Sequence, residues 1–101
     1  MSKSWLLIAA ATLALSLAGP AQAGDAAAGE AKAKSCASCH GPDGEGVKDN
    51  PPIAGMDEGA FVAALAAYKD GSKEHKMMNM LSKKLSDEDM ANLAAYYATL
   101  K

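Results

Sequence analysis

The sequence predicts a small all-α domain in which three to four helices wrap around a bound group. No run of β-branched residues alternates with polar ones, so no segment is typical of a strand. Half of the 101 residues are apolar but only five are aromatic, which leaves the chain short of large side chains for a core of its own. Long turn-rich segments separate the helical stretches, and loops of that length in so small a domain must fold around something.

Composition and charge exclude several classes of protein. The ten lysines, absent arginine and twelve acidic residues give a net charge of −2, which is not the balance of a basic nucleic-acid binder. Two cysteines are too few for a disulfide-stapled scaffold. The length allows one domain.

The first 23 residues have the pattern of a cleaved secretory signal. Lys3 precedes an uncharged apolar run at 5–17, and a small-x-small pattern ends at Ala23, where we expect cleavage. A retained membrane anchor is disfavoured, because a spanning helix needs about 20 apolar residues. The mature domain is then residues 24–101, and export places it in an oxidising compartment, most simply a bacterial periplasm.

The first predicted helix of the mature domain covers residues 25–35. Asp25 is suited to cap it, and the alanines that follow favour a helix. Residues 41–55 contain many glycines and prolines, which is typical of an ordered loop.

The second predicted helix covers residues 58–69, with Asp57 as its N-cap. Its large apolar side chains recur at i, i+4 and i+7 and share one face: Phe61, Leu65 and Tyr68. Gly71 ends the helix, because glycine readily takes the left-handed conformation found after a helix C-terminus.

The third predicted helix begins with a capping box formed by Ser86 and Asp89. One apolar stripe runs along it: Met90, Leu93, Ala94, Tyr97 and Leu100. Between the second and third helices, residues 72–84 are expected to be a turn-rich segment, and they carry three of the six methionines.

The sequence Cys36-Ala37-Ser38-Cys39-His40 is a C-x-x-C-H motif, which predicts covalent attachment of one haem c. One helical turn would present the sulfurs of Cys36 and Cys39 to the two vinyl groups of the haem. The imidazole of His40, which follows directly, would ligate the iron on the proximal side.

Two other interpretations of the cysteines are weaker. A redox-active C-x-x-C disulfide normally opens a helix after a strand, and no such unit is visible. A zinc site needs two further ligands, and His75 is the only other histidine.

The distal iron ligand is expected in the segment before the third helix. The candidates are His75, Met77, Met78 and Met80. A methionine thioether raises the reduction potential of a haem, whereas a second histidine would lower it. The residues themselves leave this choice open, since methionine is also a common filler of gaps in cores.

The mature chain resembles a class I monohaem cytochrome c, above all the short bacterial cytochrome c-553 type and single domains of the cytochrome c4 type. The similarity covers essentially all of 24–101. The matching pieces are 36–41 (CASCHG), 43–44 (DG), 51–55 (PPIAG), 68–72 (YKDGS) and 85–97 (LSDEDMANLAAYY).

The resemblance implies Met78 as the distal ligand, by its spacing from Leu85, with Met77 and Met80 as alternatives. It also implies that the carbonyl of Pro51, or less readily of Pro52, accepts a hydrogen bond from the proximal histidine.

Two further roles follow from the same resemblance. Ile53 would pack on the haem, and Gly29 would let the first and last helices cross closely.

With both axial positions filled by the protein, the iron has no open site for a substrate. We therefore expect a periplasmic, monomeric electron carrier without catalytic residues, which exchanges electrons with a donor and an acceptor protein, for example in a respiratory chain. Five lysines near the methionine segment are a candidate docking region for such partners: Lys69, Lys73, Lys76, Lys83 and Lys84. The alternatives are a dedicated electron-transfer subunit of one oxidoreductase complex, and a ligand-binding haem protein if the distal site is open.

Overall fold

A computed structural model describes residues 24–100, which form five helices and no strand. The predicted all-α fold is therefore confirmed, whereas the predicted signal segment 1–23 lies outside the described residues. In chain order the helices are α1 (Ala26–Lys32), α2 (Lys34–His40), α3 (Glu58–Asp70), α4 (Lys76–Ser82) and α5 (Asp87–Ala98). In this part of the chain no helix is long and apolar enough to cross a bilayer.

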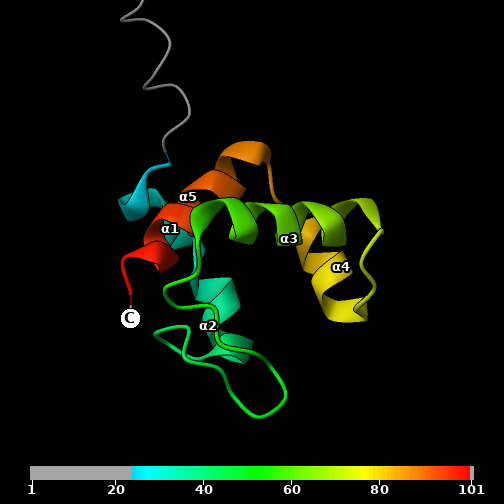
Figure 1. The fold of residues 1–101 in the computed structure, drawn as a ribbon, viewed down its shortest axis with the longest axis horizontal. Helices are drawn as coiled ribbons and strands as arrows, with labels where there is room; N and C mark the ends of the chain where they lie inside the picture. The colour runs from blue at the N-terminus through cyan, green and yellow to red at the C-terminus, as the bar shows by residue number, and fades with distance from the viewer. Residues whose placement is uncertain (1–23, 101) are drawn as a thin grey trace, which may run out of the picture.

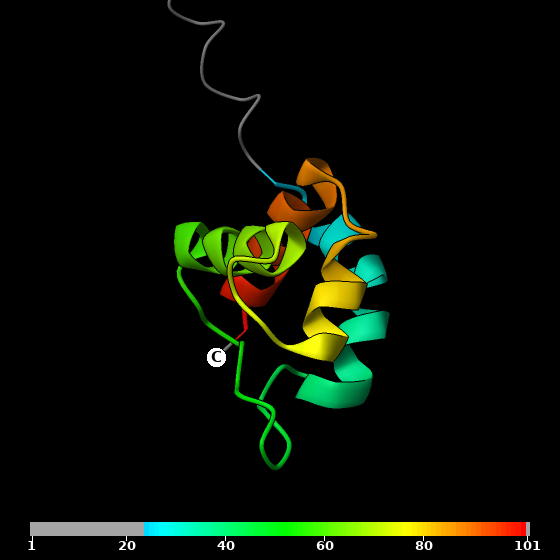
Figure 2. The ribbon, with the colours of Figure 1, turned by 90° about the vertical axis from the view of Figure 1, so that its right-hand side faces the viewer.

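Helices α1, α3 and α5 enclose the core, since α5 packs against both α1 and α3. Helix α4 packs against α3, and α2 and α4 lie on the same side of α3 in both views (Figures 1 and 2). The buried apolar side chains form one cluster that includes most of the predicted helix faces: Ala33, Phe61, Leu65, Met90, Leu93, Ala94 and Tyr97. This core is small, as the scarcity of large side chains predicts.

The first and last helices cross at very short range. A Cβ atom added to Gly29 would lie 1.9 Å from the backbone oxygen of Asn92 and 2.9 Å from Cβ of Tyr96. Near the same crossing, the backbone N–H of Asp25 donates to Oδ1 of Asn92 over 2.8 Å. No side chain fits at position 29 without moving one of the two helices.

The predicted helix caps are present. Asp25 Oδ1 accepts the backbone N–H of Ala27 over 2.9 Å, and Asp57 Oδ2 accepts that of Ala60 over 3.0 Å. Gly71 has a φ of 87° and ends α3 in the left-handed conformation, as glycine allows.

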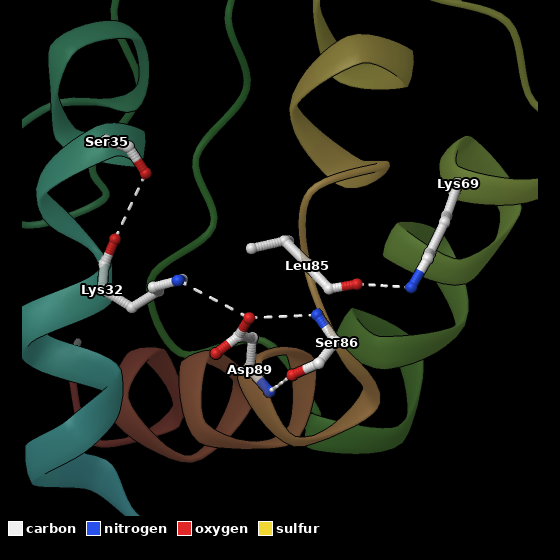
Figure 3. Close-up of polar contacts among 6 residues, drawn as sticks. All are labelled: Lys32, Ser35, Lys69, Leu85, Ser86 and Asp89. Carbon is white, nitrogen blue, oxygen red and sulfur yellow. Dashed lines mark hydrogen bonds and ion pairs between the residues drawn. The ribbon is translucent and has the colours of Figure 1, made fainter.

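The start of α5 is held by a reciprocal capping box (Figure 3). Ser86 Oγ accepts the N–H of Asp89, and Asp89 Oδ2 accepts the N–H of Ser86, each over 3.0 Å. Lys32 of α1 lies 3.6 Å from the same carboxylate. The pKa of Asp89 is lowered, chiefly by the hydrogen bond from the backbone of Ser86 and further by the charge of Lys32.

We expect Asp89→Asn to lose stability in a pH-dependent way. Because the folded pKa of Asp89 is below its ordinary value of 3.8, the carboxylate stabilises the fold fully above that value. This contribution is lost as the pH falls through the lower folded pKa. Urea unfolding at several pH values should therefore give the wild type a higher free energy of unfolding than Asp89→Asn at neutral pH. In strong acid the two free energies should be equal. Asp87→Asn is the control, because it removes one negative charge from the same turn. If Asp87→Asn lowers the free energy of unfolding by the same amount and with the same pH dependence, the role of the capping box is contradicted.

The structure differs from the predicted elements in two places. The predicted first helix is divided at Ala33 into α1 and α2. Ala33 keeps a right-handed helical conformation, with φ of −67° and ψ of −10°, and α2 then runs to His40. The segment expected to be a turn-rich connection contains α4. Its lysine, methionine and leucine residues are good helix formers, and His75 caps it. The methionines thus lie on a helix instead of in a loop.

Candidate haem-binding site

Helix α2 carries all three residues of the C-x-x-C-H motif. Cys36 and Cys39 are free thiols, each half-buried, and lie about one helical turn apart. Cys36 packs against the core cluster. His40 is the last residue of the helix. A single short helix thus presents two thiols and an imidazole together.

The surroundings of Cys36 are apolar. Burial raises the pKa of the Cys36 thiol, and hydrogen bonds with Ser35 and Tyr97 lower it by less. Burial and the neighbouring Cys36 sulfur likewise raise the pKa of Tyr97, whose side chain is 1% exposed. Both groups are therefore neutral at physiological pH.

The imidazole of His40 is oriented by the following loop. Its Nδ1 lies 2.7 Å from the carbonyl oxygen of Pro51, and a carbonyl can only accept, so Nδ1 carries the proton. One residue earlier in each segment, Asn50 Nδ2 donates to the carbonyl of Cys39 over 3.0 Å. These paired contacts hold two neighbouring residues of the loop against two of α2. Nε2 is then the nitrogen left to ligate a metal.

The loop between α2 and α3 folds back on itself. The N–H of Gly46 donates to the carbonyl of His40 over 2.7 Å, and that of Ile53 donates to the carbonyl of Gly44 over 2.8 Å. Gly46 has a φ of 94°, and a Cβ there would lie 2.9 Å from the nitrogen of Pro52. Ile53 is half-buried and packs against the core cluster. The loop thus brings both Pro51 and Ile53 toward the motif.

Helix α4 separates the three candidate methionines by exposure. Met78 is half-buried and packs against the core cluster. Met77 and Met80, three residues apart, are each 48% exposed. His75 is exposed and serves as the N-cap of α4, since its Nδ1 accepts the N–H of Met78 over 3.3 Å. Among these four candidates, only Met78 combines an inward position with a flexible thioether.

Asn79, which no sequence motif singles out, connects α4 to the end of α3. Its Nδ2 donates to the carbonyls of Tyr68 and Lys73, and its Oδ1 accepts the N–H of His75, each over 2.8 Å. A helical interpretation of this segment, with His75 at its start, would have drawn attention to it.

Comparison with known proteins identifies the family. The family model for cytochrome c matches residues 26–101, which is most of the chain. The chain belongs to the cytochrome c family. It is 43% identical over 97 residues to cytochrome c4 of Pseudomonas aeruginosa, covering 94% of this chain and 48% of that protein. It is 41% identical over 81 residues to cytochrome c-554(548) of Halomonas halodenitrificans, covering 76% of this chain and 98% of that protein.

Solved structures agree with this family. Cytochrome c4 of Acidithiobacillus ferrooxidans superposes with a TM-score of 0.75 at 27% identity, over 82% of this chain and 53% of that one. A thiosulfate dehydrogenase of Marichromatium purpuratum superposes with a TM-score of 0.73 at 32% identity, over 81% of this chain and 20% of that one. The chain thus spans about half the length of its cytochrome c4 relatives.

As a member of the cytochrome c family, the chain binds haem c covalently. The residues present fit this group: two free thiols on one turn, and an imidazole whose Nδ1 is occupied by Pro51. Within the described residues, no group of three or more His, Cys, Asp and Glu side chains could hold a metal ion alone.

The five candidate docking lysines differ in their surroundings. Lys69 is half-buried and donates through Nζ to the carbonyl of Leu85, which connects α3 to the start of α5 (Figure 3). Lys73 Nζ lies 5.3 Å from the ring centroid of Tyr68. All but Lys69 are exposed: Lys73, Lys76, Lys83 and Lys84. Lys69 is thus engaged within the fold.

Proposed function

We propose that this cytochrome c is an exported carrier of single electrons with a six-coordinate haem c. In this proposal Cys36 and Cys39 form the two thioether bonds, and His40 Nε2 and the Met78 sulfur are the axial ligands. Pro51 and Ile53 form part of the surroundings. No residue acts as a catalytic group. Residues 1–23 direct the chain to the periplasm and are removed there.

The observation that carries the proposal is the 2.7 Å contact between His40 Nδ1 and the Pro51 carbonyl. A hydrogen bond at Nδ1 fixes the tautomer and the ring orientation and makes Nε2 more basic, which is what a permanent metal ligand requires. Asn50 braces the same loop through its bond to Cys39. These two contacts thereby hold the imidazole in one orientation.

Support for Met78 on the distal side comes from its position on α4. Among the three methionines of α4, it is the one that packs against the core cluster, whereas Met77 and Met80 are each 48% exposed. A thioether is a soft, neutral ligand, and with histidine opposite it favours a high reduction potential.

When bound, haem c supplies one reversible electron through its iron. His40 and Met78 would hold the iron, and the core cluster beside them would keep the site apolar, so that little would have to move when the charge changes. Rigidity on the histidine side follows from the bonds between α2 and the 41–55 loop. In this proposal redox partner proteins dock on the exposed surface near α4, and the positive charges of Lys76, Lys83 and Lys84 attract them.

Carbon monoxide tests whether the distal position is closed. We expect the reduced native protein not to bind carbon monoxide at concentrations that saturate a five-coordinate haem, because Met78 already holds the sixth position. The absorption spectrum in the Soret region reports binding directly. Ready binding by the native protein would contradict the proposal and favour a ligand-binding haem protein.

A second candidate function is that of a dedicated electron-transfer subunit of one oxidoreductase complex. The similarity to part of a thiosulfate dehydrogenase favours it, since the matched region covers 20% of that chain. Affinity purification of the tagged protein at native expression separates the two functions. A stoichiometric enzyme partner would support the subunit, and a protein recovered alone would support the free carrier.

A further inference from the structure

We infer that Asn79 is a positioning residue for the distal ligand, and that its amide keeps Met78 in place against competing ligands. The inference rests on the proposed function, in which Met78 ligates the iron. It concerns a residue that neither the motif nor the spacing of the methionines singles out.

The side chain of Asn79 makes three hydrogen bonds to backbone groups in three places. Nδ2 donates to the carbonyl of Tyr68, near the end of α3, and to the carbonyl of Lys73, in the connection to α4. Oδ1 accepts the N–H of His75, the cap residue of α4. All three N···O distances are 2.8 Å.

Only an amide can make this set of bonds. Two donor hydrogens and an acceptor oxygen are needed at once, at the end of a short side chain. The carbonyl of Tyr68 is among the last four of α3, which lack a partner within the helix, so Asn79 satisfies a group that the fold leaves open. An apolar side chain at position 79 would leave three backbone groups without this partner.

The bonds fix the segment that carries Met78. The connection from α3 and the cap of α4 are both held by Asn79, which directly follows Met78. His75 in turn accepts the N–H of Met78. The Asn79 bonds thus resist any motion of the backbone that carries Met78, since a shift of α4 against α3 would break them.

Exogenous imidazole measures how often this motion occurs. Imidazole can bind ferric iron only while Met78 is displaced, so its apparent affinity and association rate scale with the population of the open state. We expect Asn79→Ala and the isosteric Asn79→Asp each to raise both quantities at least about tenfold, which corresponds to about 1.4 kcal/mol. Asn79→Asp keeps the shape and the acceptor, but it replaces both donor hydrogens with a carboxylate oxygen that two carbonyls repel.

Asn92→Ala is the matched control. Asn92 also bonds a backbone group through its side chain, at the crossing of α1 and α5, away from α4. Urea unfolding of all variants gives the global loss of stability. We expect Asn92→Ala to unfold more easily while its imidazole binding stays within about twofold of the wild type. Equal effects of position 79 and position 92 on imidazole binding, at equal loss of stability, would overturn the inference.

The same measurements separate this inference from the proposed function. If Met78→Ala leaves imidazole binding unchanged, then Met78 is not the displaced ligand and both statements fail. If Met78→Ala binds imidazole freely and the Asn79 variants behave as the wild type, the ligand assignment stands and only the role of Asn79 is wrong.

Discussion

Replacing Met78 with alanine is expected to abolish the weak red absorption band that iron–methionine coordination gives the oxidised protein. The reduction potential should fall with it, on the order of 0.2 V within the roughly 0.8 V range that axial ligands cover, because a thioether favours ferrous iron. The reduced variant should also bind carbon monoxide. Absorption spectra and a potentiometric titration of the exported holoprotein measure all three effects.

Met77→Ala and Met80→Ala are the controls for this prediction. Both side chains are 48% exposed on the same helix, so their loss removes a methionine without removing the inward-facing one. We expect each to retain the red band and a potential close to that of the wild type. A band that persists in Met78→Ala and disappears in one of the controls would assign the ligand to that residue instead.

The largest loss of stability is expected for Gly29→Ala. The added Cβ would lie 1.9 Å from the backbone oxygen of Asn92, and backbone atoms cannot rotate away as a flexible side chain can. Alanine gains about 1 kcal/mol of helix propensity over glycine, but overpacking a helix contact costs about 1–3 kcal/mol and sometimes more. At a contact this short we expect the cost to dominate, with a net decrease of at least about 2 kcal/mol in urea unfolding.

Gly59→Ala tests the same exchange where the neighbouring atom belongs to a side chain. Gly59 lies in the first turn of α3, and an added Cβ would meet the Asp57 carboxylate at 3.2 Å, a tight contact that a small movement of this side chain relieves. Helix propensity should then dominate, and the variant should be as stable as the wild type or more so. If Gly29→Ala is also neutral, the close crossing of α1 and α5 is not a determinant of stability.

Local signals made most helix ends predictable from the sequence. Asp25, Asp57 and Ser86 each cap a helix through bonds to residues two or three positions away, and Gly71 ends α3 by its own conformation. These interactions depend on neighbours in the chain, so a sequence pattern contains them. The apolar stripe of α5 was predictable for the same reason.

Contacts between distant segments were less accessible to sequence analysis. Helix α4 was missed because a histidine is an unusual cap and because a cluster of methionines suggested a ligand loop. The bonds of Asn79 to Tyr68 and Lys73 span 11 and 6 residues, and no local sequence pattern predicts them. The placement of Pro51 near His40 also spans 11 residues and was expected only through resemblance to the family. The assignments of the cysteines, His40 and Met78 to the haem stay predictions.

The absorption spectrum of the protein, exported with haem-attachment machinery and recorded oxidised and reduced, tests the central claim most directly. We predict a sharp α band in the reduced form, retention of the haem on the chain after denaturation, and the weak red band in the oxidised form. Together these signatures mean covalent haem with histidine and methionine as ligands. Covalent haem without the red band would contradict Met78 as the ligand and favour His75 or an open distal site, and a chain without haem would contradict the whole account.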